Sequence, residues 1–315
     1  MLSAAAVRKL KIALGVLVVV LLIFKFGLLT SRAVPEKSRF AIDLAALRTA
    51  AGPVESLPES ARADRVASLM MPCFLAVTGG PLALCSLVQY GWQLIYPDGS
   101  SVILDPVHSR ATQDKNSGDT YDDQAWERQE AAIAVARVIA VTHEHYDHLG
   151  GATDSKHFAS FGDKLKLTAA QRKKAPLAGV ERDLSGPATL DSGPEGSLHP
   201  IAPGVVAITA PGHTPGSQLI YLRLKGGAEF LLLGDLVWQN LNLELAVGRA
   251  RLPSLIMSED TEGTVNQLRA VLELKKANPT LDLVVAHDAA AMEARFKAGT
   301  VASGLIVPTP APPAP

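Results

Sequence analysis

The stretch VTHEHYDHLGG, from Val141 to Gly151, decides how the rest of the chain is interpreted. The six residues from His143 to His148 include three histidines and two acidic residues. They come shortly after the apolar run VIAV. A short, β-branched run of this kind predicts a buried strand. The polar cluster would then lie in the loop at the carboxyl end of that strand. Layered α/β proteins often place their sites there, because a rigid sheet holds the converging loops.

One alternative for this cluster is the helical zinc-protease motif. That motif is H-E-x-x-H, which brings both histidines to one face of a helix. In this chain His143 and Glu144 are followed at the required position by Asp147. The segment before them is also strand-like, so the spacing disfavours a helical protease site.

An extended loop gives a different arrangement. His143 and His145 alternate, so in an extended backbone their side chains point the same way and reach one ion. Asp147 and His148 follow as the chain turns, and they can reach a second ion beside the first. The pair Gly150-Gly151 allows close backbone approach and a sharp exit. A metal ion needs three or four ligands, so this cluster requires partners from elsewhere in the chain.

Three polar residues at other predicted strand ends are the candidates. His213 lies in APGHTPG, Asp235 follows the run LLLG, and His287 follows LVVA. A single histidine at a strand end is more often an ordinary hydrogen-bonded residue than a ligand. Three such residues together with the cluster favour a metal site.

The combined pattern resembles the metallo-β-lactamase superfamily. The resemblance rests on H-x-H-x-D-H, then G-H-T-P-G, then G-D, then a C-terminal histidine, and it runs from about Leu84 to Asp288. It implies an α/β fold, a four-layer αβ/βα sandwich with the site at one edge. It also implies a set of ligands to two metal ions. The first ion would be bound by His143, His145 and His213, the second by Asp147, His148 and His287, and Asp235 would bridge them.

The same resemblance implies a function. Two metal ions, most simply zinc, with iron or manganese as alternatives, would activate a bridging hydroxide for hydrolysis. Asp147 and Asp235 would be the catalytic carboxylates. Asp105, in VILDP, matches a position where the family often has an Asp that supports the site, outside the ligands themselves.

The bond cleaved would be an ester, lactone, thioester or amide. The bridging aspartate is similar to that of glyoxalase-II-like thioesterases and acyl-homoserine-lactone lactonases. Lactonases often carry a tyrosine three residues later, where this chain has Trp238. Tyr146 and Trp238 are candidates to line the substrate cleft, although Trp238 would equally suit the core. Two other functions stay open: a mononuclear iron enzyme of the persulfide-dioxygenase type, and a non-catalytic, membrane-anchored metal-binding module.

Composition limits the partners. The formal net charge is -1 and aromatic residues make up 5% of the chain. Nucleic-acid binding usually requires a strong basic excess, so we expect a small-molecule substrate and no nucleic-acid partner.

The N-terminus predicts export. Arg8, Lys9 and Lys11 accompany the apolar run from Ile12 to Phe24. This is the pattern of a secretory signal, and an uncleaved membrane anchor is the alternative. Either would place the rest of the chain in an extracytoplasmic, for example periplasmic, location. There Cys73 and Cys85 could form a disulfide, whereas otherwise they would be two small buried residues.

The sequence divides into four predicted parts. Residues 1–33 are the signal peptide or anchor, 34–83 a helical lead-in, 84–300 the hydrolase domain, and 301–315 a proline-rich disordered tail. Three remaining histidines (His108, His157 and His199) lie in loops without matching partners and are interpreted as ordinary polar residues. Glu144 is expected to be solvated or to support the ligands.

Overall fold

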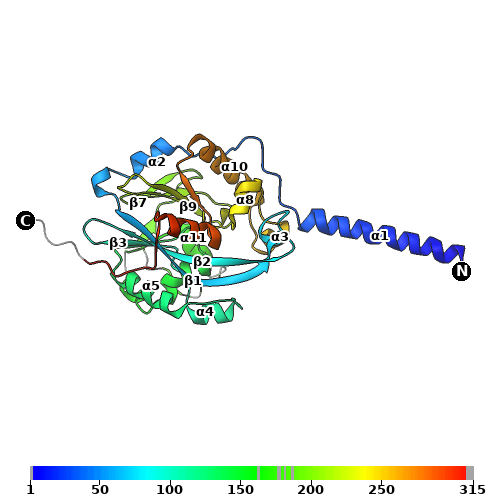
Figure 1. Ribbon diagram of the computed structural model, residues 1–315, viewed down its shortest axis with the longest axis horizontal. Coiled ribbons are helices and arrows are strands. Elements are labelled where there is room, and N and C mark those ends of the chain that lie inside the picture. The colour runs from blue at the N-terminus through cyan, green and yellow to red at the C-terminus, as the bar shows by residue number, and fades with distance from the viewer. Residues whose placement is uncertain (1–2, 162–163, 176–178, 181, 186–187, 310–315) are drawn as a thin grey trace, which may run out of the picture.

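The protein forms two mixed β-sheets packed face to face, with helices on the outer side of each (Figure 1). The computed structural model of the chain describes residues 3–161, 164–175, 179–180, 182–185 and 188–309. This is the four-layer α/β arrangement that the sequence predicts.

The first sheet has seven strands in the order β12-β1-β2-β3-β4-β5-β6. Its strands are β1 (Ser60–Pro72), β2 (Leu84–Ile95), β3 (Ser101–Leu104), β4 (Val138–Ala140), β5 (Leu165–Thr168), β6 (Ala188–Leu190) and β12 (Ala302–Ser303). The hairpin of β1 and β2 is antiparallel, and β3 to β6 run parallel.

The second sheet has five strands in the order β11-β10-β9-β8-β7. They are β7 (Leu198–Ala202), β8 (Val205–Thr209), β9 (Gln218–Arg223), β10 (Glu229–Leu232) and β11 (Asp282–Val284).

The helices cover the outer faces and connect the strands. They are α1 (Ala4–Leu28), α2 (Leu44–Ala50), α3 (Cys73–Ala76), α4 (Arg110–Lys115), α5 (Asp123–Val135), α6 (Tyr146–Asp154), α7 (Ala169–Lys174), α8 (Asn240–Leu245), α9 (Arg251–Ile256), α10 (Thr261–Ala277) and α11 (Ala289–Ala298), with short 3-10 turns η1 (Val54–Ser56), η2 (Phe158–Ser160) and η4 (Gly234–Leu236). Asp260 caps α10, because its side chain accepts hydrogen bonds from the N–H groups of Glu262 and Gly263.

Apolar residues alternate between two cores along the central strands. In β9, Leu219 and Tyr221 pack beneath α2 and α10, whereas Ile220 and Leu222 pack between the two sheets. When both faces of a strand are covered, the side chains on both faces are buried, and its sequence is therefore a continuous apolar run. The third core, which includes Ile103, joins the first sheet to α5 and α6. These three cores hold the four layers together.

The segment predicted as a helical lead-in is only partly helical. Residues 44–50 form α2, but Ser60–Pro72 form β1, the long strand that pairs with β2. Its sequence SARADRVASLMMP interrupts the apolar pattern with charges, and its register shifts between Arg65 and Ala67. The charged residues conceal the period of two that identifies a strand.

The predicted C-terminal tail also begins inside the fold. Residues 302–303 pair with β1. The side-chain amide of Gln93 donates to the backbone oxygen of Ile306 and accepts a hydrogen bond from its N–H. Residues 310–315 lie outside the described part of the chain. The other boundaries between the four parts remain predictions.

Cys73 and Cys85 form a disulfide with a Cα–Cα distance of 4.9 Å. It joins the start of α3 to the start of β2. Closing a loop of this length stabilises a fold by about 3 kcal/mol in the chain-entropy account.

Helix α1 projects away from the domain (Figure 1). Among the described residues, α1 is the one helix that is long and apolar enough to cross a membrane, over the stretch Ala6–Leu28. None of this stretch is buried against the domain. A signal sequence has the same properties.

Candidate metal centre

The histidine cluster lies between the end of β4 and the start of α6. His143 and His145 are in the connecting loop, and Asp147 and His148 are in the first turn of α6. The helix continues through Gly150 and Gly151, so these glycines do not form the predicted sharp exit. They do allow close approach, because a Cβ at Gly151 would lie 2.5 Å from the carbonyl oxygen of Val107.

The other three predicted ligands come from the second sheet. His213 follows β8, Asp235 lies in η4 directly after β10, and His287 follows β11. Gly234 has a φ of +50° and would place a Cβ 2.8 Å from Thr142. A side chain at position 234 would therefore push the Asp235 turn away from the β4 loop.

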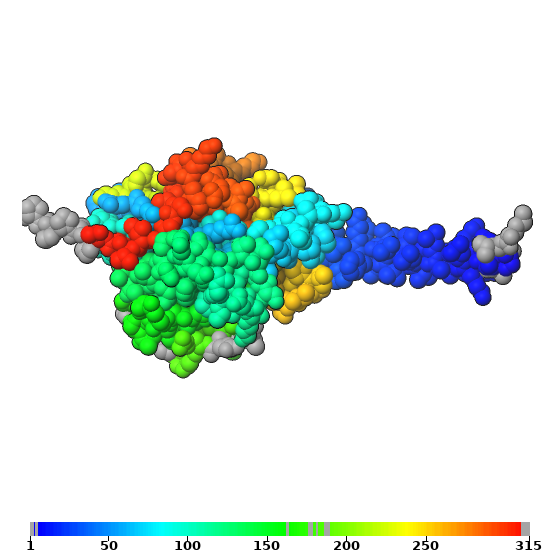
Figure 2. Space-filling model, turned by 60° about the horizontal axis from the view of Figure 1, so that its bottom comes forward, coloured from blue at the N-terminus to red at the C-terminus, as the bar shows by residue number. Residues whose placement is uncertain are grey.

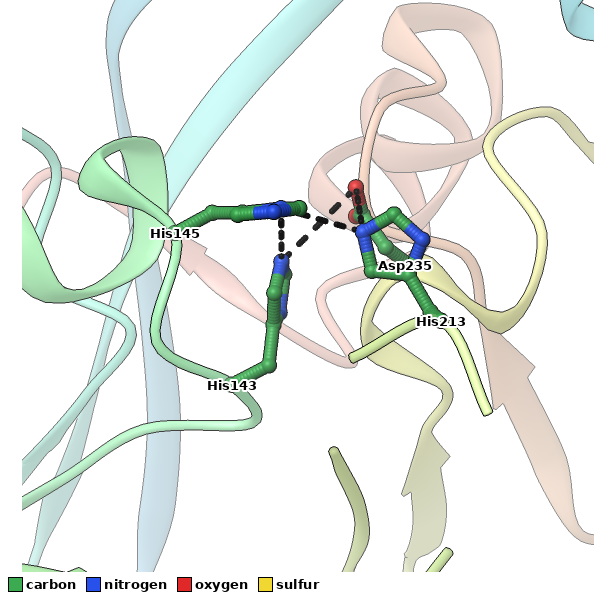
Figure 3. Close-up of side chains that lie close together, drawn as sticks. All are labelled: His143, His145, His213 and Asp235. Atoms are coloured by element: carbon green, nitrogen blue, oxygen red, sulfur yellow. Dashed lines mark hydrogen bonds and ion pairs between the residues drawn. The ribbon is translucent and has the colours of Figure 1, made fainter. Parts of the chain in front are cut away.

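Three imidazoles and one carboxylate form the first group (Figure 3). The Nδ1 atom of His145 lies 3.0 Å from Nε2 of His143 and 3.0 Å from Nε2 of His213. Oδ2 of Asp235 lies 3.3 Å from Nε2 of His213. A tetrahedral zinc ion with Zn–N bonds of about 2.0–2.1 Å separates its ligand nitrogens by about 3.3 Å. The group has the donors and the spacing for one such ion.

The second group uses the other oxygen of the same carboxylate. Oδ1 of Asp235 lies 2.9 Å from Nε2 of His287 and 3.2 Å from Nε2 of His148. Oδ2 of Asp147 lies 3.8 Å from each of these two nitrogens. All seven predicted ligands therefore meet in two adjoining groups that share Asp235.

Two buried atoms test whether a cation fits here. Among the described residues, Nε2 of His148 and Oδ1 of Asp235 are buried and make no contact with hydrogen-bond geometry, although they lie 3.2 Å apart. Buried polar atoms are rarely left unpaired in native proteins, and a bound ion is one of the standard reasons. The donor set and these unpaired atoms fit a metal ion between the two groups.

Asp105 orients His148. Its carboxylate accepts hydrogen bonds from the backbone and hydroxyl of Thr142, and its Oδ2 lies 2.9 Å from Nδ1 of His148. A bond from Nδ1–H to a carboxylate leaves Nε2 free for a metal and fixes the ring. Asp105 adopts a left-handed backbone with a φ of 48°, which aspartate tolerates better than most residues. The supporting role predicted for Asp105 matches this geometry.

Burial sets the charge of the first three histidines. It lowers the pKa of His143 and His213 well below the ordinary imidazole value, and it lowers the pKa of His145. These rings are neutral at pH 7, which is the form that binds metal.

For His148 and His287, the nearby carboxylates raise the pKa by more than burial lowers it. Burial lowers the pKa of His148, but Asp105 and other nearby carboxylates raise it well above the ordinary value. Burial likewise lowers the pKa of His287, and Asp235 raises it above the ordinary value. Burial raises the pKa of Asp235, yet His287 and His148 together bring it well below the usual value. Without metal, this half of the site holds protons that a metal ion must displace.

Glu144 is buried, not solvated. It accepts hydrogen bonds from the hydroxyl of Thr214 and the backbone N–H of Gly216, both in the loop that carries His213. Because it alternates with His143 and His145, its side chain points away from the imidazoles. It therefore ties the two ligand loops together.

Arg249 contacts the site and was not predicted from the sequence. Its guanidinium lies 2.8 Å from Nδ1 of His213, pairs with Glu259 at 2.8 Å, and donates to the backbone oxygen of Asp235. It also stacks over the ring of Trp238. The sequence GRARLP gives no signal for this role, since a single arginine in a loop is usually exposed.

A cavity of about 640 Å³ opens above the metal centre. His145, Asp147, Asp235 and His287 lie at its floor, and Tyr146 and Trp238 line its wall, as predicted. Trp238 also packs in an apolar cluster and donates its indole N–H to Oδ2 of Asp235 at 2.7 Å. Both interpretations of Trp238, as core and as cleft residue, therefore apply. His108, His157 and His199 belong to neither ligand group. His108 hydrogen-bonds Gln113, with its ring centroid 5.0 Å from that of Tyr146, and His199 hydrogen-bonds the backbone oxygen of Ser192.

Comparisons with known proteins agree with the fold and the cluster. The Metallo-beta-lactamase superfamily profile matches residues 92–287. A probable metallo-hydrolase of Mycobacterium tuberculosis is 30% identical over 179 residues, which are 48% of this chain and 54% of that protein. The chain thus spans about half the length of this relative. A hydroxyacylglutathione hydrolase of Acidiphilium cryptum is 28% identical over 209 residues, 66% of this chain and 68% of that protein.

Solved structures support the same fold. A quorum-quenching N-acyl homoserine lactone lactonase aligns with a TM-score of 0.59 and 15% identity, covering 76% of this chain and 95% of that one. An N-acyl homoserine lactone hydrolase with N-hexanoyl-L-homoserine at its catalytic metal centre aligns with a TM-score of 0.60 and 14% identity, covering 76% and 96%.

Replacing Asp105 with asparagine tests the orientation of His148. Asparagine has one acceptor oxygen where aspartate has two, so it cannot accept hydrogen bonds from both Thr142 and His148. We therefore expect the affinity of the protein for metal to fall by about 10- to 100-fold. Competition with a chelating dye measures this affinity. Asp64→Asn is the control, because Asp64 is buried to a similar degree but pairs with Arg128. Equal losses of affinity in both variants would contradict the assignment.

If each ligand group binds a metal ion, acidification should remove the two ions in sequence. The raised pKa values of His148 and His287 mean that protons compete with metal there already near neutral pH, above the ordinary imidazole pKa of about 6.5. The lowered pKa values of His143, His145 and His213 protect the first group to lower pH. Equilibrium dialysis with metal analysis from pH 8 downward should show half of the metal leaving first. Simultaneous loss of all the metal contradicts this order.

Proposed function

Since the chain belongs to the metallo-beta-lactamase superfamily, we propose that it is a hydrolase with two bound metal ions, zinc in the first instance. The observation that carries this proposal is the pair of ligand groups that share the carboxylate of Asp235 at the floor of a cavity. His143, His145 and His213 would hold one ion. Asp147, His148 and His287 would hold the other.

The chemistry depends on both ions and on the residues around them. When bound by these residues, two divalent ions would lower the pKa of a water and polarise the oxygen of the scissile carbonyl. Asp147 has the more open carboxylate of the two, with 15% of its side chain exposed against 5% for Asp235. It faces the cavity and is suited to orient the attacking water and to accept its proton. Trp238 and Arg249 hold the Asp235 turn in place.

The cavity favours a substrate with an apolar part. Its wall includes Leu69, Met71, Leu87, Trp238 and Met257. A volume of this size suits a small molecule, with apolar walls for binding and a few polar groups for orientation. The hydroxyacylglutathione hydrolase and lactonase relatives support cleavage of an acyl bond: an ester, lactone, thioester or amide.

We also propose that α1 is a membrane anchor and that the domain lies outside the cytoplasm. Basic residues before the apolar run favour a cytoplasmic N-terminus, and the disulfide suits an oxidising compartment. The segment after α1 is bound to the domain: the backbone oxygen of Thr30 accepts from Arg251, and Arg32 pairs with Glu262 at 2.9 Å. These contacts support an anchor that stays attached.

A substrate screen on the purified full-length chain tests the hydrolase. The panel contains esters, thioesters, lactones, β-lactams and phosphodiesters, each with and without a chelator. We expect cleavage of an acyl substrate, lost with chelator and lowered more than about 100-fold by His143→Ala. His157→Ala is the matched control, because His157 lies outside the ligand groups. Full activity of His143→Ala, or oxygen uptake with a persulfide in place of hydrolysis, contradicts the proposal.

A further inference from the structure

Four exposed apolar side chains lie around the end of α1 nearest the domain. Leu82 is 93% exposed, Leu84 63%, Leu255 65% and Ile256 76%. We call these four residues the apolar rim. Large apolar side chains gathered on a surface mark a site of interaction, because water solvates them poorly.

The rim is a single region although its residues are distant in sequence. Leu82 lies between α3 and β2, and Leu84 is the first residue of β2. The Cys73–Cys85 disulfide and a hydrogen bond from the Cys73 N–H to the Ala83 oxygen hold this segment. Leu255 and Ile256 end α9, and α9 contacts both α3 and α1. Figure 2 shows the cyan segment of α3 and β2 and the gold segment of α9 on either side of the blue helix α1.

The joint between α1 and the domain is direct. The helix ends at Leu28, and the oxygen of Thr30 already accepts a hydrogen bond from Arg251 at the start of α9. A helix of 25 residues is about 37 Å long, enough to cross a hydrocarbon core of about 30 Å. With α1 in a bilayer, no free linker separates the domain from the membrane. The face around Thr30, which carries the rim, must then lie at the level of the lipid headgroups.

The cavity wall is continuous with the rim. Ile256 belongs to both, and next to it Met257, Leu69 and Met71 line the cavity. An apolar surface therefore runs from the rim to the cavity, whose lining includes Asp147 and Asp235.

From this continuity we infer that the rim docks the domain onto the bilayer and that the substrate is an amphiphile taken from it. The substrate would carry a long hydrocarbon chain that lies against the apolar wall, with its hydrolysable polar group at the metal centre. The docking part rests on the proposed membrane anchor α1 and on the geometry of the rim. The substrate part rests on the proposed hydrolase.

A fluorescent label tests docking without any enzyme assay. The two native cysteines form the disulfide, so Leu255→Cys gives one reactive thiol in the full-length chain. An environment-sensitive dye at this position, in liposomes with nitroxide-labelled acyl chains, should lose about half of its emission or more. Val135→Cys is the control, because Val135 is exposed near the Ile95 end of β2. That end lies about 36 Å along the strand from Leu84.

Two outcomes of the labelling overturn docking. Emission at position 255 that matches the control means that the rim faces water. A blue shift without nitroxide quenching means that a second copy of the chain covers the rim.

Kinetics of a rim variant test the substrate class. The variant combines Leu82→Glu, Leu84→Glu and Leu255→Glu, none of which is among the described residues that line the cavity. It should cleave a long-chain substrate in vesicles about tenfold more slowly, because acidic side chains bind poorly at the interface between bilayer and water. It should cleave a short, water-soluble analogue with the same bond at the wild-type rate.

The control combines Val54→Glu, Val135→Glu and Val307→Glu, exposed apolar positions away from the rim. It should leave both rates unchanged. Equal loss on both substrates, or no loss on either, overturns the substrate class. If the wild type cleaves neither substrate, the proposed hydrolase fails together with the substrate class, and the label still decides docking.

Discussion

The carboxylate of Asp235 lies between two groups of imidazoles, and the rest of the site depends on how it is held. One oxygen faces His213 and His143, and the other faces His148 and His287. Without a cation between the groups, the nearby carboxylates raise the pKa of His148 and His287, so these two rings hold protons beside Asp235. The fold must therefore keep this carboxylate fixed while the charge around it changes.

The two sheets provide that fixation from opposite sides. The first sheet supplies the β4 loop and the start of α6, and the second supplies the three remaining ligands at the ends of β8, β10 and β11. Contacts between the loops then lock the halves together. Glu144 reaches from the first half to the His213 loop, and Gly234 lets the Asp235 turn approach Thr142. Neither residue binds metal in this account, yet both set the distance between the ligand groups.

The sequence was most informative where chemistry is dense and local. The cluster at 143–148 and the three distant strand ends predicted which seven side chains meet in space, because His and Asp after apolar runs stand out from ordinary loops. The fold followed from the same runs. The charged strand β1 lies in the segment predicted as a helical lead-in, because its polar residues conceal a period of two, and the strands β5 to β7 are too short to show a period. Arg249 and the buried position of Glu144 depend on tertiary contacts between loops, which no local pattern encodes.

The most direct measurement of the central claim is anomalous X-ray diffraction from crystals of the metal-loaded protein, recorded at the absorption edge of the bound metal. The account predicts two peaks, one about 2.0–2.1 Å from nitrogens of His143, His145 and His213, and one at similar distances from His148 and His287, with an oxygen of Asp235 contacting each. A single peak with His148 and His287 unligated, or peaks away from Asp235, would contradict the two-metal site.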